Sequence, residues 1–191
     1  EFFGYNAIMK ALRQSLRQRR RDIAPSDRIK FAKNLLAQVQ KLTNFHDGQK
    51  VALYLPNDGE IDPKNIQNFL DLLKISIYLP ILVGKSLKFA KIGENFRKNQ
   101  YGILEPISTD IIDAEQLDIL FMPLVGFDSN KNRIGMGGGY YDRTLAFKKR
   151  QKSFKNPKLY GLAFDCQQVE KLEVQDWDVP LDAIITPSKI Y

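Results

Sequence analysis

One glycine-rich string carries most of the chemistry that this sequence offers. Residues 133–143 read Arg-Ile-Gly-Met-Gly-Gly-Gly-Tyr-Tyr-Asp-Arg. Four glycines in five positions allow backbone conformations that other residues rarely adopt, and they let successive amides approach an anion closely. If a helix begins at Tyr140, its unpaired N–H groups and its dipole would favour the same anion. The string therefore predicts a phosphate cradle, although a glycine-rich loop is on its own equally typical of a plain turn.

Two common phosphate-binding motifs do not match this string. It is not a Walker A loop, because no Gly-Lys-Ser/Thr follows the glycines. It is not the Rossmann fingerprint either, because that motif follows the first strand of its fold. Arg133, at the start of the string, could add a charged clamp to the amides.

Cysteine and histidine are too scarce to build several other kinds of site. Cys166 is the single cysteine and His46 the single histidine. A disulfide, a Cys-His nucleophile or a histidine-rich zinc site is therefore not expected, and a lone thiol fits a reducing compartment. No stretch approaches the roughly 20 apolar residues that cross a bilayer, and the amino-terminal segment lacks the apolar run of a signal peptide. We expect a cytoplasmic protein without a membrane partner.

The charge balance indicates the sign of the partner and little more. The formal net charge is +7, which attracts nucleic acids, nucleotides and other anions alike. A cluster near the amino terminus contributes part of this excess: Arg17, Arg19, Arg20 and Arg21. We expect these arginines to form a solvated helix face, so they do not predict an RNA-binding arm.

The chain has the length and patterning of one α/β domain over residues 1–191. Helical periodicity predicts a helix over residues 6–23 and a second from Pro25 to Lys41. A strand at 51–55, a helix starting near Pro63 and a strand at 75–79 form a β-α-β unit.

The second half of the chain continues this alternation of strands and helices. Strands are expected at 87–92, 117–122, 159–164 and 183–186, with a long loop at 93–113. A glycine-rich connection at 123–139 leads to a helix over 140–150. The predicted fold has three layers: a mainly parallel sheet flanked by helices, Rossmann-like but not a true dinucleotide fold. Ligands should bind where the loops at the carboxyl ends of the strands converge.

The glycine-rich string resembles the signature of the 5-formyltetrahydrofolate cyclo-ligase family, also called 5,10-methenyltetrahydrofolate synthetases. The resemblance runs almost from end to end of the chain. It includes Lys10, Leu12, Arg13, Glu60, residues 101–106 and 121–128, and finally Asp178, Pro180, Leu181, Asp182 and Thr186. One position departs from the pattern, because Trp177 stands where many members carry a histidine.

The resemblance implies a reaction and its cofactors. Family members cyclise 5-formyltetrahydrofolate to 5,10-methenyltetrahydrofolate with ATP and Mg²⁺, and they release ADP and phosphate. ATP phosphorylates the formyl oxygen to an iminium phosphate, which N10 then attacks, so no protein nucleophile is needed. We expect the folate, with or without a polyglutamate tail, and ATP as partners, no nucleic acid, and a monomer.

The resemblance also implies a role for each matching residue. Catalysis falls to Arg133 and Asp142, and magnesium to Asp142 and Asp178. ATP would contact Lys10, Arg13, Arg133, Ile134, Gly135, Met136, Gly137, Gly138, Gly139, Tyr140 and Tyr141. The folate would contact Leu55, Glu60, Gly137, Gly138, Gly139, Tyr140 and Tyr141.

Each role has a structural alternative. The cations of the first helix could be solvated, Asp142 could be a first-turn helix acid, and Asp178 could be a turn residue. Glu60 could be an ordinary loop acid, and the two tyrosines could belong to the core.

Two other classes of function are compatible with parts of the sequence. A nucleic-acid-binding module would suit the isoelectric point near 9.4 and would bind RNA in a salt-dependent way. A nucleotide-dependent kinase or sugar-phosphate enzyme would suit the glycine-rich loop alone. Dependence of turnover on a folate separates these alternatives from a cyclo-ligase.

Overall fold

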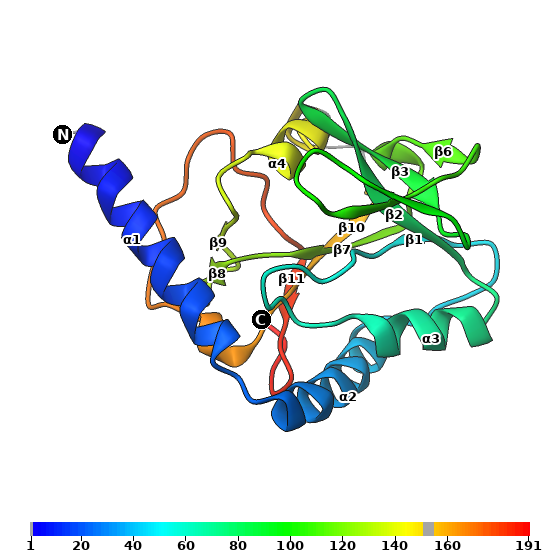
Figure 1. The fold of residues 1–191 in the computed structure, drawn as a ribbon, viewed down its shortest axis with the longest axis horizontal. Coiled ribbons are helices and arrows are strands. Elements are labelled where there is room, and N and C mark those ends of the chain that lie inside the picture. Colours follow the sequence, from blue (N-terminus) through cyan, green and yellow to red (C-terminus); the bar gives the residue numbers. More distant parts are fainter. Residues whose placement is uncertain (1, 151–154) are drawn as a thin grey trace.

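A seven-stranded sheet forms the centre of the computed structural model, which describes the backbone of residues 2–150 and 155–191 and the side chains of residues 7–150 and 155–191. Five neighbouring strands are parallel: β11 (Ala183–Ile185), β10 (Lys158–Leu162), β7 (Ile119–Pro123), β1 (Lys50–Ala52) and β2 (Ser76–Val83). The sheet ends in two antiparallel strands, β3 (Ser86–Lys91) and β6 (Ile111–Ile112). Figure 1 shows this sheet running through the middle of the molecule.

Helices α2 (Pro25–Leu42) and α3 (Lys64–Leu72) cover one face of the sheet, below it in Figure 1. Leu35 and Val39 of α2 and Ile66 and Leu70 of α3 are fully buried in the core on this side. The predicted helical stripes and the β-α-β unit are therefore confirmed.

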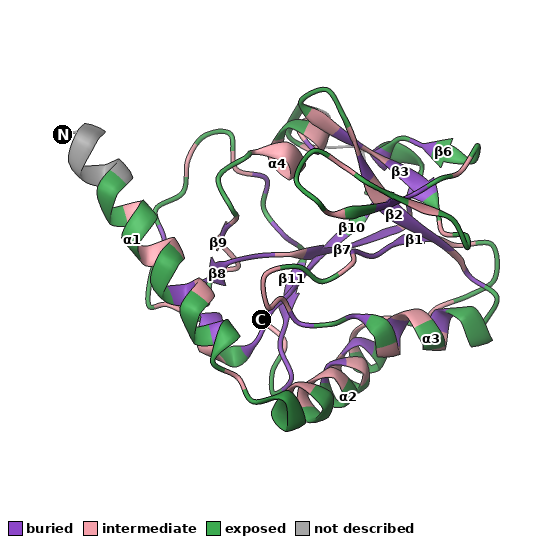
Figure 2. Ribbon diagram, in the orientation of Figure 1, coloured by how far each residue is buried: buried purple, intermediate pink, exposed green. Residues whose placement is uncertain are grey.

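The opposite face is covered by short elements. These are α4 (Tyr140–Thr144), α5 (Phe147–Arg150) and residues 179–182, which precede β11. Leu145, Val179 and Leu181 pack there against strand residues such as Leu120 and Met122. Figure 2 shows the buried strands between the exposed outer surfaces of the two layers, which confirms the predicted three-layer architecture.

The expected long loop at 93–113 was wrong, because it contains strands. β4 (Phe96–Lys98) and β5 (Leu104–Pro106) form a hairpin, and β6 joins the sheet. The polar composition concealed them because Glu105, in β5, is buried and accepts hydrogen bonds from Leu82 N at 2.8 Å and Asn99 Nδ2 at 3.0 Å. Burial of a satisfied carboxylate is not visible as a hydrophobic pattern.

The expected helix over 140–150 was also wrong in its length. It is interrupted after α4, which has five residues, and the fully buried Leu145 lies at the interruption. The connection before it holds a short hairpin of β8 (Gly126–Phe127) and β9 (Arg133–Ile134). The dipole of so short a helix gives much less support to an anion than the predicted one.

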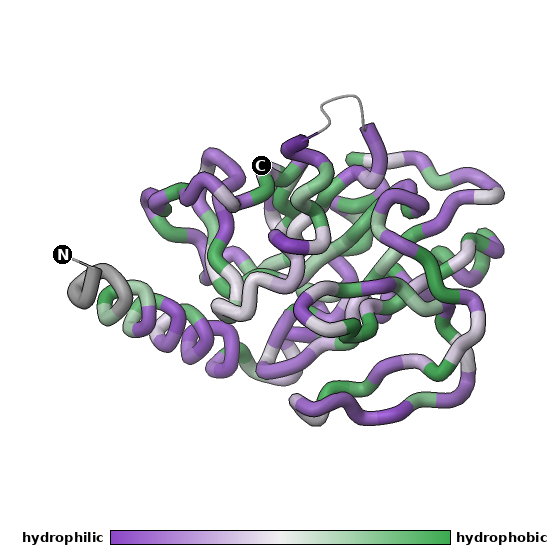
Figure 3. The backbone as a smooth tube through the Cα atoms, turned by 90° about the horizontal axis from the view of Figure 1, so that it is seen from above, coloured by the Kyte–Doolittle hydropathy of each residue, from purple (hydrophilic) through white to green (hydrophobic). Residues whose placement is uncertain are grey.

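Helix α1 (Phe2–Arg21) lies across the loops that follow the carboxyl ends of the strands. Leu16 is fully buried against Val125, Ile134 and Leu172. Gly126 permits this contact, because a Cβ atom there would lie 2.5 Å from Leu16 Cδ1. Figure 3 shows α1 extending beyond the body of the protein, with mainly hydrophilic turns. Among the described residues, every helix is too short or too polar to cross a membrane.

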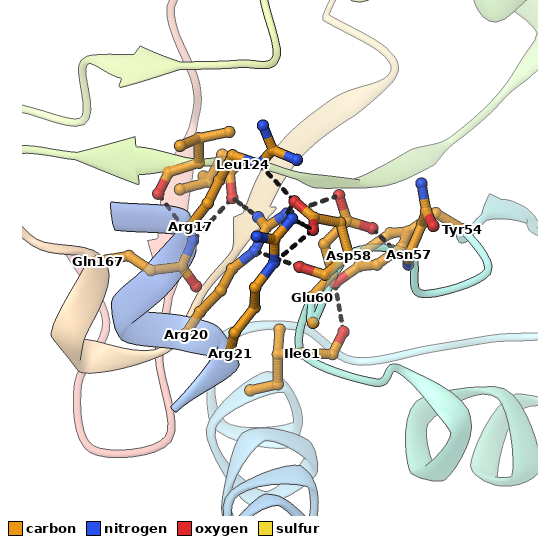
Figure 4. A network of polar contacts seen from close by, with 12 residues as sticks. Arg17, Arg20, Arg21, Tyr54, Asn57, Asp58, Glu60, Ile61, Leu124 and Gln167 are labelled. Carbon is orange, nitrogen blue, oxygen red and sulfur yellow. Dashed lines mark hydrogen bonds and ion pairs between the residues drawn. The ribbon is translucent and has the colours of Figure 1, made fainter. Parts of the chain in front are cut away.

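A buried guanidinium anchors α1 to two of these loops (Figure 4). Arg20 is fully buried and donates from Nε to Asp58 O at 2.9 Å and from Nη1 to Leu124 O at 3.2 Å. Its Nη2 lies 3.0 Å from Asp58 Oδ2. Arg17 and Arg21 also bond the Asp58 carboxylate. The expected solvated face was therefore wrong for the buried Arg20 and the half-buried Arg17. Arg21 is exposed but is paired with Asp58, and Arg19 is exposed as expected.

Asp58 remains ionised because of the arginines around it. Partial burial would raise the pKa of its carboxyl group, but hydrogen bonds from Arg17 and Arg21 and the charge of Arg20 lower the pKa to about 2. Asp58 also adopts a positive φ of 51° in the turn that begins the loop after β1.

We predict that Arg20→Met lowers the free energy of unfolding by about 3–5 kcal/mol, because it leaves buried partners of the guanidinium without a donor. Denaturant unfolding of the purified variant measures the loss. Arg19→Met, one residue away and exposed, is the matched control and should change stability by less than about 0.5 kcal/mol. Equal stability of the two variants would contradict the anchoring role.

Candidate functional site

The glycine loop, defined here as Gly135–Gly139, lies between β9 and α4 and contacts α1. Arg13 Nε donates to Gly135 O at 2.9 Å, although the two residues are 122 positions apart. Gly137 and Gly139 adopt positive φ angles of 97° and 64°, which other residues rarely adopt. The structure thus brings the predicted cation Arg13 to the predicted loop.

The outer part of the loop is open to solvent. Met136, Gly137 and Gly138 are exposed, and so is Lys10, which lies one turn before Arg13 on α1. Residues three apart on a helix share a face, so Lys10 and Arg13 point toward the same side of α1. Lys10 is exposed, as its structural alternative expects, whereas Arg13 contacts the loop.

Two residues predicted to share the catalytic work form an ion pair. Arg133 Nη2 lies 2.6 Å from Asp142 Oδ1, and the two side chains are 10% and 18% exposed. Within the described part of the chain, the buried Arg133 Nε has no hydrogen-bond partner. An unpaired buried donor is costly, so Arg133 is set up to donate to a further acceptor.

Asp142 also reaches the segment that contains Asp178. The backbone N–H of Val179 donates to Asp142 Oδ1 at 3.4 Å. Asp178 Oδ2 accepts from Gln175 N at 2.8 Å, so Asp178 closes a turn, as its structural alternative expects. The adjacent Trp177 is 66% exposed. The two predicted metal acids therefore lie in adjoining segments.

These carboxylates suit a magnesium ion that is shared with a phosphate. The described residues contain no group of three or more His, Cys, Asp or Glu side chains that could hold a metal. Mg²⁺ commonly takes one or two carboxylates and completes its shell with waters and substrate phosphate oxygens. Asp142 and Asp178 fit that donor set, whereas a metal held by protein side chains alone does not fit.

Glu60 lies on the loop after β1, beside the Arg20 anchor (Figure 4). Its Oε2 accepts from Asn57 N at 3.0 Å, and its Oε1 is 3.9 Å from Arg20 Nη2. Burial raises the pKa of Glu60 to about 7, against the opposing effects of the Asn57 hydrogen bond and the Arg20 charge, and the charge of Asp58 adds to the rise. An ordinary solvated loop acid would show no such shift.

Two tyrosines lie near Glu60, and one of them also lies near Arg133. Tyr54 is buried and donates to Ile61 O at 2.7 Å, and burial followed by the charge of Glu60 raises its pKa. Burial and the charge of Glu60 also raise the pKa of Tyr141, whereas Arg133 lowers it. Tyr141 therefore lies near both Glu60 and Arg133, although the sequence separates Glu60 widely from the other two.

The other aromatic and aliphatic candidates face different surroundings. Tyr140 turns toward the β4–β5 hairpin, where its hydroxyl lies 2.7 Å from the Tyr101 hydroxyl. Both Tyr140 and Tyr141 also pack against the core on the α4 side of the sheet, as their structural alternative expects. Leu55 is half-buried against the core on the side of α2 and α3.

Three residues of this region were not expected near the site from the sequence: Arg20, Asp58 and Tyr54. The turn at Asn57-Asp58-Gly59 was visible as a loop signal, but its arginine partners lie about 40 positions earlier in α1. Asp128 was noted only within a matching stretch. It is buried and accepts from Asn132 N and Leu172 N, so it ties the β8–β9 hairpin to the segment that leads toward Asp178.

Solved structures of two methenyltetrahydrofolate synthetases share this fold. The NMR structure of 5,10-methenyltetrahydrofolate synthetase from Aquifex aeolicus matches 95% of this chain and 90% of its own, with a TM-score of 0.80 and 26% identity. The synthetase from Mycoplasma pneumoniae matches 93% of this chain and 98% of its own, with a TM-score of 0.73 and 26% identity.

Curated sequences agree with the structures. The 5-formyltetrahydrofolate cyclo-ligase of Escherichia coli K12 is 35% identical over 92% of this chain and 98% of its own length. That of Haemophilus influenzae is 36% identical over 91% of this chain and 95% of its own length. A model of the 5-formyltetrahydrofolate cyclo-ligase family matches residues 6–187. From its fold and along nearly its whole sequence, this chain belongs to the 5-formyltetrahydrofolate cyclo-ligase family.

Proposed function

We propose that residues 1–191 form one domain that converts 5-formyltetrahydrofolate to 5,10-methenyltetrahydrofolate with magnesium ATP and releases ADP and phosphate. Beside family membership, one observation carries this proposal. Arg13 of α1, Glu60 of the loop after β1 and the stretch 133–142, which holds the glycine loop and the Arg133–Asp142 pair, come from three distant parts of the sequence. Arg13 bonds the glycine loop, and Glu60 lies near Tyr141 in the same stretch. A direct transfer between two substrates needs such an arrangement.

In this proposal the nucleotide phosphates bind to the glycine loop. Residues 133–141 supply backbone amides, and Lys10, Arg13 and Arg133 supply positive charge. The unpaired Nε of Arg133 supports this assignment, because an anionic oxygen would satisfy it. Asp142 and Asp178 hold the magnesium ion. Arg133 Nη2 and the backbone N–H of Val179 both donate to Oδ1 of Asp142, so Oδ2 is the oxygen that we assign to the ion.

The folate binds beside the phosphates. Glu60 accepts hydrogen bonds from N–H groups of the pterin, Leu55 packs on its ring, and Tyr141 adds an aromatic surface. Residues Gly137–Tyr141 contact both substrates. The proximity of Tyr141 to both Glu60 and Arg133 supports this shared boundary.

The reaction then proceeds in three steps without a protein nucleophile. The formyl oxygen attacks the γ-phosphorus, the bond to the ADP oxygen breaks, and an iminium phosphate forms. N10 attacks the iminium carbon to close the ring and loses its proton. Phosphate then leaves with the former formyl oxygen, which gives the methenyl product. Arg133 and the loop amides stabilise the transferred phosphoryl group, and a magnesium ion held by Asp142 and Asp178 would offset charge on the phosphates.

The rival functions receive less support. The basic amino-terminal cluster is largely engaged within the protein, because Arg17, Arg20 and Arg21 bond Asp58. Those charges are therefore not a free surface for RNA. Membership of a folate-enzyme family argues against a sugar-phosphate kinase. A monomeric state, a cytoplasmic location and the absence of nucleic-acid or membrane partners stay predictions.

The test mixes the purified protein with 5-formyltetrahydrofolate and magnesium ATP and follows the near-ultraviolet absorbance of the methenyl product. We expect absorbance to grow only when ATP, magnesium and the folate are all present. A folded protein that binds ATP but forms no product would contradict the proposed function.

We predict that Asp142→Asn lowers turnover roughly tenfold or more and raises the magnesium concentration for half-maximal rate by a similar factor, because the ion loses a charged ligand. A magnesium titration of the assay measures both. Asp27→Asn is the matched control, since Asp27 is an exposed first-turn acid of α2. Undiminished turnover of Asp142→Asn would make Asp142 an ordinary helix acid.

A second prediction concerns pH. Because the pKa of Glu60 is about 7, its carboxyl group is protonated below and ionised above that pH. The ionised form accepts hydrogen bonds from the pterin on both oxygens, so kcat/KM for the folate should rise as pH rises through 7. Glu60→Gln should lower kcat/KM above pH 7 roughly tenfold and remove this rise.

The control for this pH profile is Glu115→Gln. Glu115 is exposed in the short 3₁₀ helix η1 (Ala114–Gln116), which precedes the amino end of β7. Its profile should match that of the unchanged protein. A rise through pH 7 that persists in Glu60→Gln would assign the titration to another group.

A further inference from the structure

Arg143, near the end of α4, joins three elements through one guanidinium group. Its Nε donates to Lys85 O at 2.6 Å, in the turn between β2 and β3. Its Nη2 donates to Gly138 O in the glycine loop. Its Cζ lies 5.2 Å from the centroid of the Tyr140 ring. The side chain therefore spans from the sheet to the loop that we propose to hold the phosphates.

The β2–β3 turn, which Arg143 bonds, belongs to a well-paired hairpin. β2 and β3 pair over six residue positions, and Val83 and Ser86 face each other directly beside the turn. A second contact runs from the same hairpin, because Leu87 N donates to the Thr144 hydroxyl at 2.8 Å. That hydroxyl donates in turn to Tyr140 O at 2.7 Å. Two side chains near the end of α4, Arg143 and Thr144, thus hold the helix to the β2–β3 hairpin.

The sequence of the loop leaves room for the guanidinium. Gly139 has a φ of 64°, and a Cβ atom at this position would lie 2.7 Å from Arg143 Nη1. A Cβ atom on Gly138 would lie 2.9 Å from the Tyr140 ring that the guanidinium faces. A side chain at Gly138 or Gly139 would therefore collide with Tyr140 or Arg143 in their present positions.

The hydrogen bond to Gly138 O fixes the orientation of a peptide plane. In a planar trans peptide, the C=O group and the following N–H group point in opposite directions. When Arg143 holds Gly138 O, the N–H of Gly139 must point away from Arg143. Without this bond the plane could turn, and the carbonyl oxygen would then repel an anion on the other side of the loop.

An arginine suits this task better than a lysine. Its planar group offers several N–H donors in fixed directions, so it bonds two carbonyl oxygens and stacks on a ring at once. A lysine ammonium carries its donors on one atom and cannot reproduce this arrangement. The contacts of Arg143 use both properties.

We propose that Arg143 is a positioning residue that fixes the Gly138–Gly139 peptide, so that the glycine loop presents an N–H group to the nucleotide phosphates. This inference rests on the proposed function, because it assigns the loop to ATP. Arg143 itself touches neither substrate. It acts by holding the loop to the β2–β3 hairpin.

The test compares Arg143→Ala and Arg143→Lys by two readouts. The first is kcat/KM for ATP, which we expect to fall roughly tenfold or more in Arg143→Ala, the effect of one charged hydrogen bond, and less in Arg143→Lys. The second is the NMR spectrum of the ligand-free protein labelled with ¹⁵N-glycine. The amide signals of Gly138 and Gly139 should shift or broaden in both variants.

Arg150→Ala is the matched control, because Arg150 is an exposed arginine of α5 and lines the same surface pocket as Arg143. It should leave both readouts unchanged. Wild-type kcat/KM in Arg143→Ala, or a loss of kcat/KM with unaltered glycine signals, would overturn the proposal. If Arg143→Ala does not fold, Arg143→Lys decides by the same readouts, and wild-type behaviour overturns the proposal.

Different results would refute the proposed function and the positioning role of Arg143. Absence of turnover in the unchanged protein would contradict the proposed function. Altered glycine signals in the Arg143 variants need no turnover, so they test the positioning role on their own.

Discussion

The site depends on the buried charge of Arg20, which fixes α1 across the carboxyl ends of the strands. The apolar contact of α1 with the body is narrow, since Leu16 is its single fully buried leucine among the described residues. A helix with so little apolar contact needs another source of stability. Arg20 provides it by bonding the loops after β1 and β7 at once. Because Arg13 lies seven residues earlier, about two helical turns, the same anchor determines where Arg13 meets the glycine loop.

The anchor also separates the tasks of two neighbouring acids. Asp58 and Glu60 lie on the same short loop, yet the pKa of Asp58 falls to about 2 and that of Glu60 rises to about 7. The Asp58 carboxylate forms ion pairs with three arginines. The Glu60 side chain is largely buried, and its Oε1 lies 3.9 Å from Arg20 Nη2. A raised pKa in the folded state makes Glu60 favour folding most below its ordinary pKa, and this contribution is lost as pH rises toward 7. The same anchor thus leaves one acid ionised in a structural ion-pair network and the other with a pKa near neutrality, in the position that we propose for the folate.

The sequence predicted the fold and singled out the glycine loop because both depend on local signals. Apolar periodicity marked the strands and α2, and four closely spaced glycines marked the loop. The hairpin of β4 and β5 escaped because a buried Glu105 supports it through hydrogen bonds. The arginine cluster was misjudged because its partner, Asp58, is distant in sequence. In each case the missing information was a long-range polar contact, which leaves no periodic pattern.

The glycine loop shows why these long-range contacts matter for anion binding. A loop presents its amides to an anion only if its carbonyl oxygens point elsewhere, because each carbonyl oxygen carries negative partial charge. Arg13, from α1, holds Gly135 O, and Arg143, from α4, holds Gly138 O. By peptide planarity the N–H groups of Met136 and Gly139 then point away from these arginines. The glycines make the loop able to adopt many shapes, and the two arginines select one of them. The glycine motif alone is therefore an incomplete description of the site, because the residues that orient it belong to other elements of the fold.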